Sequence, residues 1–176
     1  NIWPVNPRAD EIGGLRCSPD IAGLPGVPDA AIVLLGADRA VDGIRELSAL
    51  GCGAAIVLAG GFAEVDDAGA ARQAALLSAA GDMRVLGPNT IGLVNVTDGI
   101  TLSASNALDT DERYAGGVAV VSQSGGIMGA LLSRAGDQLC RVLRQQAFGD
   151  EVLHELTDGG KPAGARGRPE ALFGLL

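Results

Sequence analysis

The sequence predicts a doubly wound α/β domain in which helices cover a parallel sheet. The first observation is two continuous apolar runs of strand length, residues 30–35 (AAIVLL) and 54–59 (AAIVLA). Unbroken apolar runs are typical of parallel strands, because both faces of such a sheet are buried. The second observation is that apolar residues recur at helical spacing between these runs, from Val41 to Leu50. The third is that glycines lie close to the ends of the runs, so the connections are short.

The N-terminal residues predict smaller elements. Residues 2–5 have the pattern of a short strand, and residues 10–17 that of a loop with two glycines. Ser18 followed by a proline is typical of an N-cap with proline at the first helical position. A short helix is therefore expected from Ser18 to about Gly23.

Two longer helices and a third strand follow. Asp38 is expected to cap the first helix, and Gly51 to end it. The second helix is expected from about residue 66 to residue 80, a stretch rich in alanine and leucine that a glycine closes. Residues 84–86 form a short strand that runs into a Gly-Pro-Asn turn. This order of strands and helices predicts a parallel sheet with crossover helices.

The pattern changes in the second half of the chain. Residues 96–116 are polar and are expected to form a loop or linker, with one short strand at residues 100–103. A strand (VAVV), a serine-glycine turn and a helix over residues 127–135 then predict the first βα unit of a second α/β domain. From about Leu139 the signal weakens, and residues 147–157 are compatible with one amphipathic helix.

Composition excludes several classes of partner. The formal net charge is −8 and the pI is about 4.5, which argues against a nucleic-acid groove or binding to an anionic membrane. No apolar run is long enough to span a bilayer. The three cysteines, Cys17, Cys52 and Cys140, include no CxxC pair and are interpreted as reduced structural thiols of a cytoplasmic protein.

Candidate binding segments follow the predicted strands, because ligands of an open parallel sheet bind beyond the carboxyl ends of its strands. Three of the five segments are rich in glycine, which lets a backbone approach a ligand closely. The segments are Asn6-Pro7-Arg8, Gly36-Ala37-Asp38, Gly60-Gly61-Phe62, Gly87-Pro88-Asn89-Thr90 and Ser122-Gln123-Ser124-Gly125-Gly126.

The serine-rich segment has two interpretations. Free N–H groups at a helix N-terminus, together with the hydroxyls of Ser122 and Ser124, suit a phosphate or another anion. Alternatively, Ser124 only caps the helix and the glycines only turn the chain. The same choice applies to Asn89, which bonds either a ligand or its own backbone.

Other polar residues are interpreted as structural or solvated. His154 is the only histidine and lies between two glutamates, so a surface role is favoured and a zinc site is not. The acidic clusters at residues 66–67 and 109–112 are interpreted as solvated loops. Ser124 lies in Ser-Gly-Gly, which is not the nucleophile elbow of a hydrolase.

Four segments in order carry a family resemblance. They are IWPVNPRADEIGGLRCSPDIAGLPGVPDAAIVLL, AAIVLAGGFAE, MRVLGPNTIGLVN and GGVAVVSQSGGIMGALL. They resemble the NDP-forming acyl-CoA synthetases, including acetate–CoA ligase (ADP-forming) and the α subunit of succinyl-CoA synthetase. The resemblance covers about residues 1–137, and its most specific part is LGPN-x-x-G-L-x-N followed by V-S-Q-S-G.

The resemblance implies a domain organisation. Residues 1–112 would be a Rossmann-like CoA-binding domain that lacks its first strand, which is expected to precede Asn1. Residues 113–138 would begin a flavodoxin-like, succinyl-CoA-synthetase-like domain, and residues 139–176 would be a divergent or irregular tail. A sheet without its first strand is expected to leave a pairing edge that favours self-association.

The resemblance also implies site residues. The residues expected to contact coenzyme A are Asn6, Pro7, Arg8, Leu58, Ala59, Gly60, Gly61 and Asn89. Those expected to hold phosphate are Ser122, Gln123, Ser124 and Gly125. The catalytic phosphohistidine of the family does not match His154, and no residue of this chain is assigned a catalytic role.

The implied function is the CoA-binding portion of an acid–CoA ligase. Such a ligase joins a small carboxylic acid to CoA through an acyl phosphate and a phosphohistidine. ATP or GTP with Mg would bind an ATP-grasp domain or subunit that the resemblance does not cover, and homo-oligomers are compatible with it. This chain alone is expected to make no acyl-CoA. The alternatives are a non-catalytic CoA- or nucleotide-binding module, such as the ligase-like part of a protein acetyltransferase, and a non-functional remnant.

Overall fold

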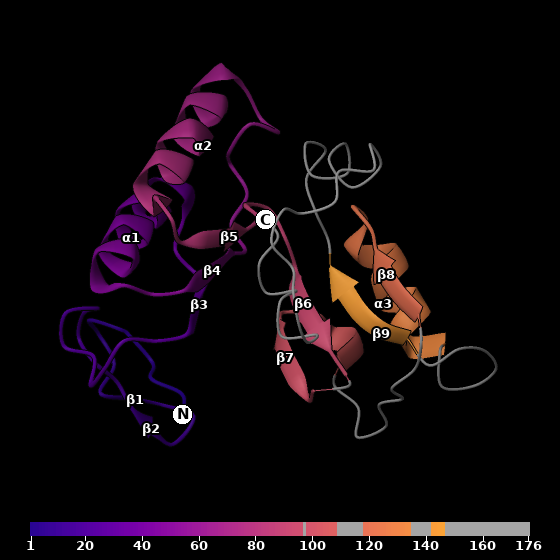
Figure 1. Ribbon diagram of the computed structural model, residues 1–176, viewed down its shortest axis with the longest axis horizontal. Helices are drawn as coiled ribbons and strands as arrows, with labels where there is room; N and C mark the ends of the chain where they lie inside the picture. The colour runs from indigo at the N-terminus through magenta and orange to yellow at the C-terminus, as the bar shows by residue number, and fades with distance from the viewer. Residues whose placement is uncertain (97, 109–117, 135–141, 147–176) are drawn as a thin grey trace.

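The computed structural model describes residues 1–96, 98–108, 118–134 and 142–146, which form two lobes (Figure 1). The first lobe contains β1 (Glu11–Ile12), β2 (Leu15–Arg16), β3 (Ala30–Val33), α1 (Ala37–Leu50), β4 (Ala54–Val57), α2 (Asp67–Ala80) and β5 (Arg84–Leu86). The second contains β6 (Gly92–Asn95), β7 (Ile100–Ser103), the 3-10 helix η1 (Asn106–Leu108), β8 (Val118–Val121), α3 (Gly125–Arg134) and β9 (Val142–Gln146).

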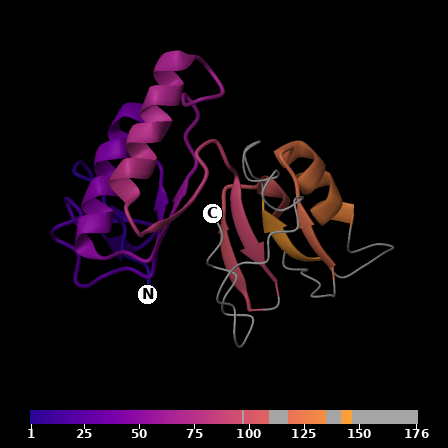
Figure 2. The ribbon, with the colours of Figure 1, turned by 45° about the horizontal axis from the view of Figure 1, so that its top comes forward.

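The first lobe is built on a parallel sheet with strand order β3-β4-β5. Both crossover helices, α1 and α2, lie side by side on one face of this sheet (Figures 1 and 2). Two right-handed crossovers that progress in the same direction place their helices on the same face. The predicted α/β class and the parallel sheet are therefore confirmed, although in the part of the chain described these helices cover one face and not two.

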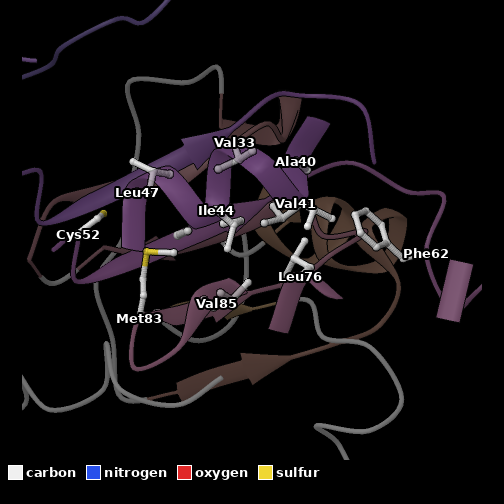
Figure 3. Close-up of a cluster of buried hydrophobic side chains, with 13 residues drawn as sticks. Val33, Ala40, Val41, Ile44, Leu47, Cys52, Phe62, Leu76, Met83 and Val85 are labelled. Carbon is white, nitrogen blue, oxygen red and sulfur yellow. The ribbon is translucent and has the colours of Figure 1, made fainter. Parts of the chain in front are cut away.

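The main core lies between that sheet and its two helices (Figure 3). Alternate strand residues point into it, because side chains of a strand alternate between the two faces. Phe62, just after β4, and Leu76 of α2 are fully buried. The buried members are Val33, Ala40, Val41, Ile44, Leu47, Cys52, Ala55, Val57, Phe62, Leu76, Ala80, Met83 and Val85.

The opposite face of the sheet is covered by the second lobe at β4 and β5. Ile56 of β4 and Leu86 of β5 form a small buried cluster with Leu93 of β6. Leu102 of β7 packs against the same cluster. This apolar contact fixes β6 against the end of the parallel sheet. Ile32 of β3, on the uncovered part of this face, is 42% exposed.

The helix ends agree with the sequence in three of four places. Gly51 ends α1 in the left-handed conformation (φ 91°), and its N–H donates to the last-turn carbonyls. Asp66 caps α2 by accepting the Gly69 N–H at 2.7 Å, and a glycine closes that helix at residue 81. The prediction for Asp38 was wrong, because α1 begins at Ala37 after the N-cap Gly36. The Asp38 carboxylate instead bonds a guanidinium of α2.

The N-terminal predictions were mostly wrong. Residues 2–5 form no strand and make only one isolated parallel bridge, between Val5 and Ser18. The expected loop at 10–17 contains the hairpin of β1 and β2. No helix follows Ser18, because its hydroxyl donates to the Gly23 carbonyl (3.2 Å) and the Gly23 N–H donates to Asp20 (2.7 Å). Such side-chain bonds compete with helix formation.

The second lobe contains a mixed sheet of order β7-β6-β9-β8. The strands expected at residues 100–103 and in VAVV are confirmed as β7 and β8, and α3 starts two residues earlier than predicted. Neither β6 nor β9 was predicted. Both are short: β6 pairs antiparallel with the adjacent β7, and β9 pairs with the more distant β8 in parallel and with β6 antiparallel. The helix expected at residues 147–157, His154 and Cys140 lie outside the described residues.

Two helix glycines allow a matched stability test. A Cβ at position 69 would lie 2.0 Å from the Phe62 carbonyl oxygen, whereas a Cβ at position 43 would meet only the flexible Leu35 Cδ1, at 3.0 Å. We expect Gly69→Ala to lower the free energy of unfolding by about 1–3 kcal/mol, as overpacking does. Gly43→Ala should change it by less than about 1 kcal/mol, because alanine favours helix. Urea denaturation of both variants checks this, and equal effects would contradict it.

Candidate functional site

The turns that follow β4 and β5 meet at the carboxyl edge of the parallel sheet. The Asn89 N–H donates to the Ala59 carbonyl at 2.8 Å. A Cβ at Gly60 would lie 3.4 Å from the Asn89 side-chain oxygen, so these two residues are in contact. Gly60 and Asn89 are both exposed to solvent. The structure therefore brings together two of the turns that the sequence predicted to bind a ligand.

Backbone conformation fixes the β5 turn. Gly87 has φ 100° and precedes a cis peptide bond to Pro88, and Asn89 has φ 55°. A Cβ at Gly87 would lie 2.5 Å from the Val57 carbonyl oxygen, so only glycine fits there. Asparagine is one of the few residues that tolerate the left-handed conformation, so the backbone conformation at position 89 partly explains why asparagine occurs there.

The end of the LGPN-x-x-G-L-x-N motif has a structural role. Asn95 is buried, and its side-chain amide donates to Asp98 at 2.6 Å while its oxygen accepts the Asp98 N–H at 3.2 Å. These bonds close the turn between β6 and β7. Thr90 is also buried, and its hydroxyl accepts the Gly92 N–H at 3.2 Å. Thr90 therefore shapes the chain directly after the Asn89 turn, and Asn95 shapes the later turn between β6 and β7.

Two charged residues hold the β4 turn. The Glu64 carboxylate accepts the Gly61 N–H at 2.6 Å and the Phe62 N–H at 3.2 Å. The Arg72 guanidinium of α2 donates to the Gly61 carbonyl and also, at 2.7 Å, to the Asp38 carboxylate of α1. The N–H groups of the turn are thus bonded to the Glu64 carboxylate, and its Gly61 carbonyl is bonded to the Arg72 guanidinium.

The hydrogen bonds of Glu64 affect its ionisation. Partial burial raises the pKa of this carboxyl, but backbone N–H bonds from its own residue, Gly61 and Phe62 together outweigh that effect and lower it.

The Cys52 thiol lies away from this turn. Burial raises its pKa, and its Sγ donates to the Ala54 carbonyl at 3.2 Å. Cys52 is thus a structural thiol, as predicted.

The N-terminus of α3 lies against the β5 turn segment. A Cβ at Gly125 would lie 3.2 Å from two carbons of Ile91, two residues after Asn89. Ser124 caps the helix, because its hydroxyl accepts the Ile127 N–H at 3.3 Å. The Ser122 hydroxyl accepts the Ser124 N–H at 3.1 Å. The structure thus shows the capping interpretation of Ser124, and phosphate binding by Ser122–Gly125 stays a prediction.

The remaining predicted residues have local partners. The Asn6 N–H donates to the Ser18 carbonyl, and the Asn6 side chain accepts the Arg8 N–H, each at 2.9 Å. This segment is therefore bonded within the N-terminal part of the chain. Leu58 packs on the small cluster beneath β6, and Ala59 packs on the main core.

Sequence reasoning missed Glu64 and Arg72. The signal for Glu64 was present, because an acidic residue three positions after a Gly-Gly pair can reach back to the N–H groups of the turn. Arg72 gave no such signal, since its partners lie 11 and 34 residues away. Within the described ranges, no group of three or more His, Cys, Asp and Glu side chains could hold a metal ion. None of the helices in those ranges has the length and apolar character to cross a bilayer.

Comparison with known proteins identifies the first lobe. Residues 1–96 match the family model described as a CoA binding domain. The chain belongs to the CoA binding domain family. The match includes both turns of the candidate site, up to and beyond Asn89.

The similar proteins are CoA ligases. A trans-feruloyl-CoA synthase from an unknown prokaryotic organism is 29% identical over 90% of this chain and 23% of its own length. An ADP-forming acetate–CoA ligase of Archaeoglobus fulgidus is 31% identical over 74% of this chain and 19% of its own. The apo structure of an acetyl-coenzyme A synthetase from Ca. Korarchaeum cryptofilum matches with a TM-score of 0.75 and 27% identity, over 92% of this chain and 36% of that one. The chain thus spans about a fifth of the length of these two curated relatives.

A pair of substitutions separates the backbone role of Asn89 from that of its side chain. Asn89→Gly keeps the left-handed conformation available, so we expect the thermal midpoint to fall by no more than a few degrees. Asn89→Ala places a non-glycine residue in that conformation without a side-chain amide, and should cost about 1–2 kcal/mol. Thermal denaturation of both variants tests this. A glycine variant less stable than the alanine variant would contradict it.

The lowered pKa of Glu64 predicts a pH dependence. Its contribution to stability is complete above the ordinary glutamate pKa and is lost as the pH falls through the lower folded value. We therefore expect the amide resonances of Gly61 and Phe62 to shift together in an acid titration followed by nuclear magnetic resonance. Their midpoint should lie below the ordinary pKa of a glutamate. In Glu64→Gln this transition should be absent, and its persistence there would exclude Glu64 as its source.

Proposed function

We propose that this chain is the CoA-binding portion of an NDP-forming acid–CoA ligase and binds CoA along the carboxyl edge of β3, β4 and β5. The observation that carries the proposal is the contact between the Gly60 turn and the Asn89 turn, inside the region that matches the CoA binding domain family. The relatives named as CoA ligases support it.

The residues present fit a long, flexible ligand. Gly36, Gly60 and Asn89, which follow three neighbouring strands, are all exposed. A Cβ at Gly36 would meet no atom within 4 Å, so the backbone there is open to a ligand. When bound, CoA supplies the thiol that takes up the acyl group. The described residues would bind and orient it, and Asn6, Pro7, Arg8, Leu58, Ala59 and Gly61 are proposed contacts on family resemblance.

The remaining steps of the ligase reaction belong to other parts of such an enzyme. ATP or GTP with Mg, the phosphohistidine and an ATP-grasp domain or subunit are proposed partners, as are a small carboxylic acid and a homo-oligomeric assembly in the cytoplasm. Ser122–Gly125 is the proposed phosphate-holding segment. We propose a CoA-binding domain over residues 1–112 and the start of a succinyl-CoA-synthetase-like domain over residues 113–138.

Calorimetry tests the proposal. We expect the purified chain to bind CoA and to bind NAD at least about tenfold more weakly, a difference of about 1.4 kcal/mol. In the same preparation, CoA, ATP, Mg²⁺ and acetate should yield no acyl-CoA. Equal affinity for CoA and NAD would favour a general nucleotide module. Steady turnover would show that the chain carries its own catalytic group.

A further inference from the structure

The carboxylate of Glu64 is an anion bound within the β4 turn. The two oxygens of Glu64 take up the N–H groups of Gly61 and Phe62, which is what a phosphate would do at such a turn. We propose that Glu64 is a positioning residue: its carboxylate occupies the N–H groups of Gly61 and Phe62, so that an uncharged part of CoA, its amide-bearing arm, binds at Gly60. This inference rests on the proposed function.

The position of the carboxylate disfavours a phosphate at Gly60. A Cβ at Gly60 would lie 3.0 Å from Glu64 Oε1, so the carboxylate stands directly beside the exposed glycine. A phosphate placed at Gly60 would meet a like charge, and close like charges are unfavourable. The Asn89 side-chain oxygen, 3.4 Å from the same Cβ position, is a neutral acceptor that suits an amide N–H.

A second charged residue completes the support. Arg72 donates to the Gly61 carbonyl, which points away from the N–H side that Glu64 occupies. Asp38 holds the guanidinium in place from α1. Arg72 is 29% exposed and Asp38 is 86% exposed, so the pair is only partly desolvated. The peptide at Gly61 is therefore bonded on both sides, which fixes the direction in which Gly60 faces.

Variants of Glu64 test the proposal through CoA affinity. Glu64→Ala removes the hydrogen bonds that hold the β4 turn in place. We expect CoA to bind about tenfold more weakly, which is the free energy of roughly one or two hydrogen bonds. Glu64→Gln keeps an acceptor oxygen and should recover most of that loss. Glu46→Ala removes the same charge from an exposed position on α1 and should leave the dissociation constant unchanged.

Fragments of CoA locate the affected part. We expect Glu64→Ala to weaken pantetheine and CoA by a similar factor, and to leave the affinity for 3′,5′-ADP within about twofold of the parent chain. Arg72→Lys keeps the charge but not the forked geometry, so it should show the same selective loss. Circular dichroism of each variant establishes that it is folded.

The outcomes are distinguishable. If the parent chain binds no CoA, the proposed function fails. If it binds CoA but Glu64→Ala binds equally well, only the role of Glu64 is overturned. If Glu64→Ala and Glu64→Gln both bind CoA or inorganic phosphate more tightly than the parent chain, the N–H groups of Gly61 and Phe62 form a phosphate site for which Glu64 competes, and the inference is wrong.

Discussion

One backbone hydrogen bond, from the Asn89 N–H to the Ala59 carbonyl, joins the two turns on which the candidate site depends. Parallel strands end at the same edge of a sheet, but their turns meet only if one of them bends back. The positive φ angles of Gly87 and Asn89 supply that bend. Gly60 allows the close approach, because a side chain there would press on its neighbours. The site is therefore a property of two turns and not of either one alone.

Apolar contacts join this edge of the sheet to the second lobe. Ile56 and Leu86 point away from the helices and pack on Leu93 of β6, so β4 and β5 are buried on both faces close to their turns. Ile91, on the chain between the β5 turn and β6, packs at the start of α3. A hydrophobic contact thus sets the distance between the Asn89 turn and the serine cap. Polar groups of the proposed site are thus positioned by burial of apolar residues that are not among its proposed ligand contacts.

Electrostatics within the site are local. The chain has a formal charge of −8, and an anionic cofactor must find its attraction in backbone amides or in individual arginines. In the β4 turn the amides are bonded to Glu64, and Arg72 is bonded to Gly61 and Asp38. Both charges at this turn therefore have internal partners, and their effect is to hold the backbone in place.

The sequence by itself determined the α/β class, the parallel strands, the ends of α2 and the glycine that ends α1. These features follow from apolar runs and from capping residues, which act over a few residues. It also marked Gly60 and Asn89, since turns after buried strands are recognisable locally. Only the tertiary structure decided that these two residues touch, that Ser18 starts no helix, that Asp38 pairs with Arg72 instead of capping α1, and that β6 and β9 exist. The contact of Gly60 with Asn89, the pair of Asp38 with Arg72, and β9 depend on partners distant in the chain, which outweigh the local preference of the residues concerned. The helix at Ser18 is lost to nearby side-chain hydrogen bonds, and β6 pairs both with the adjacent β7 and with the distant β9.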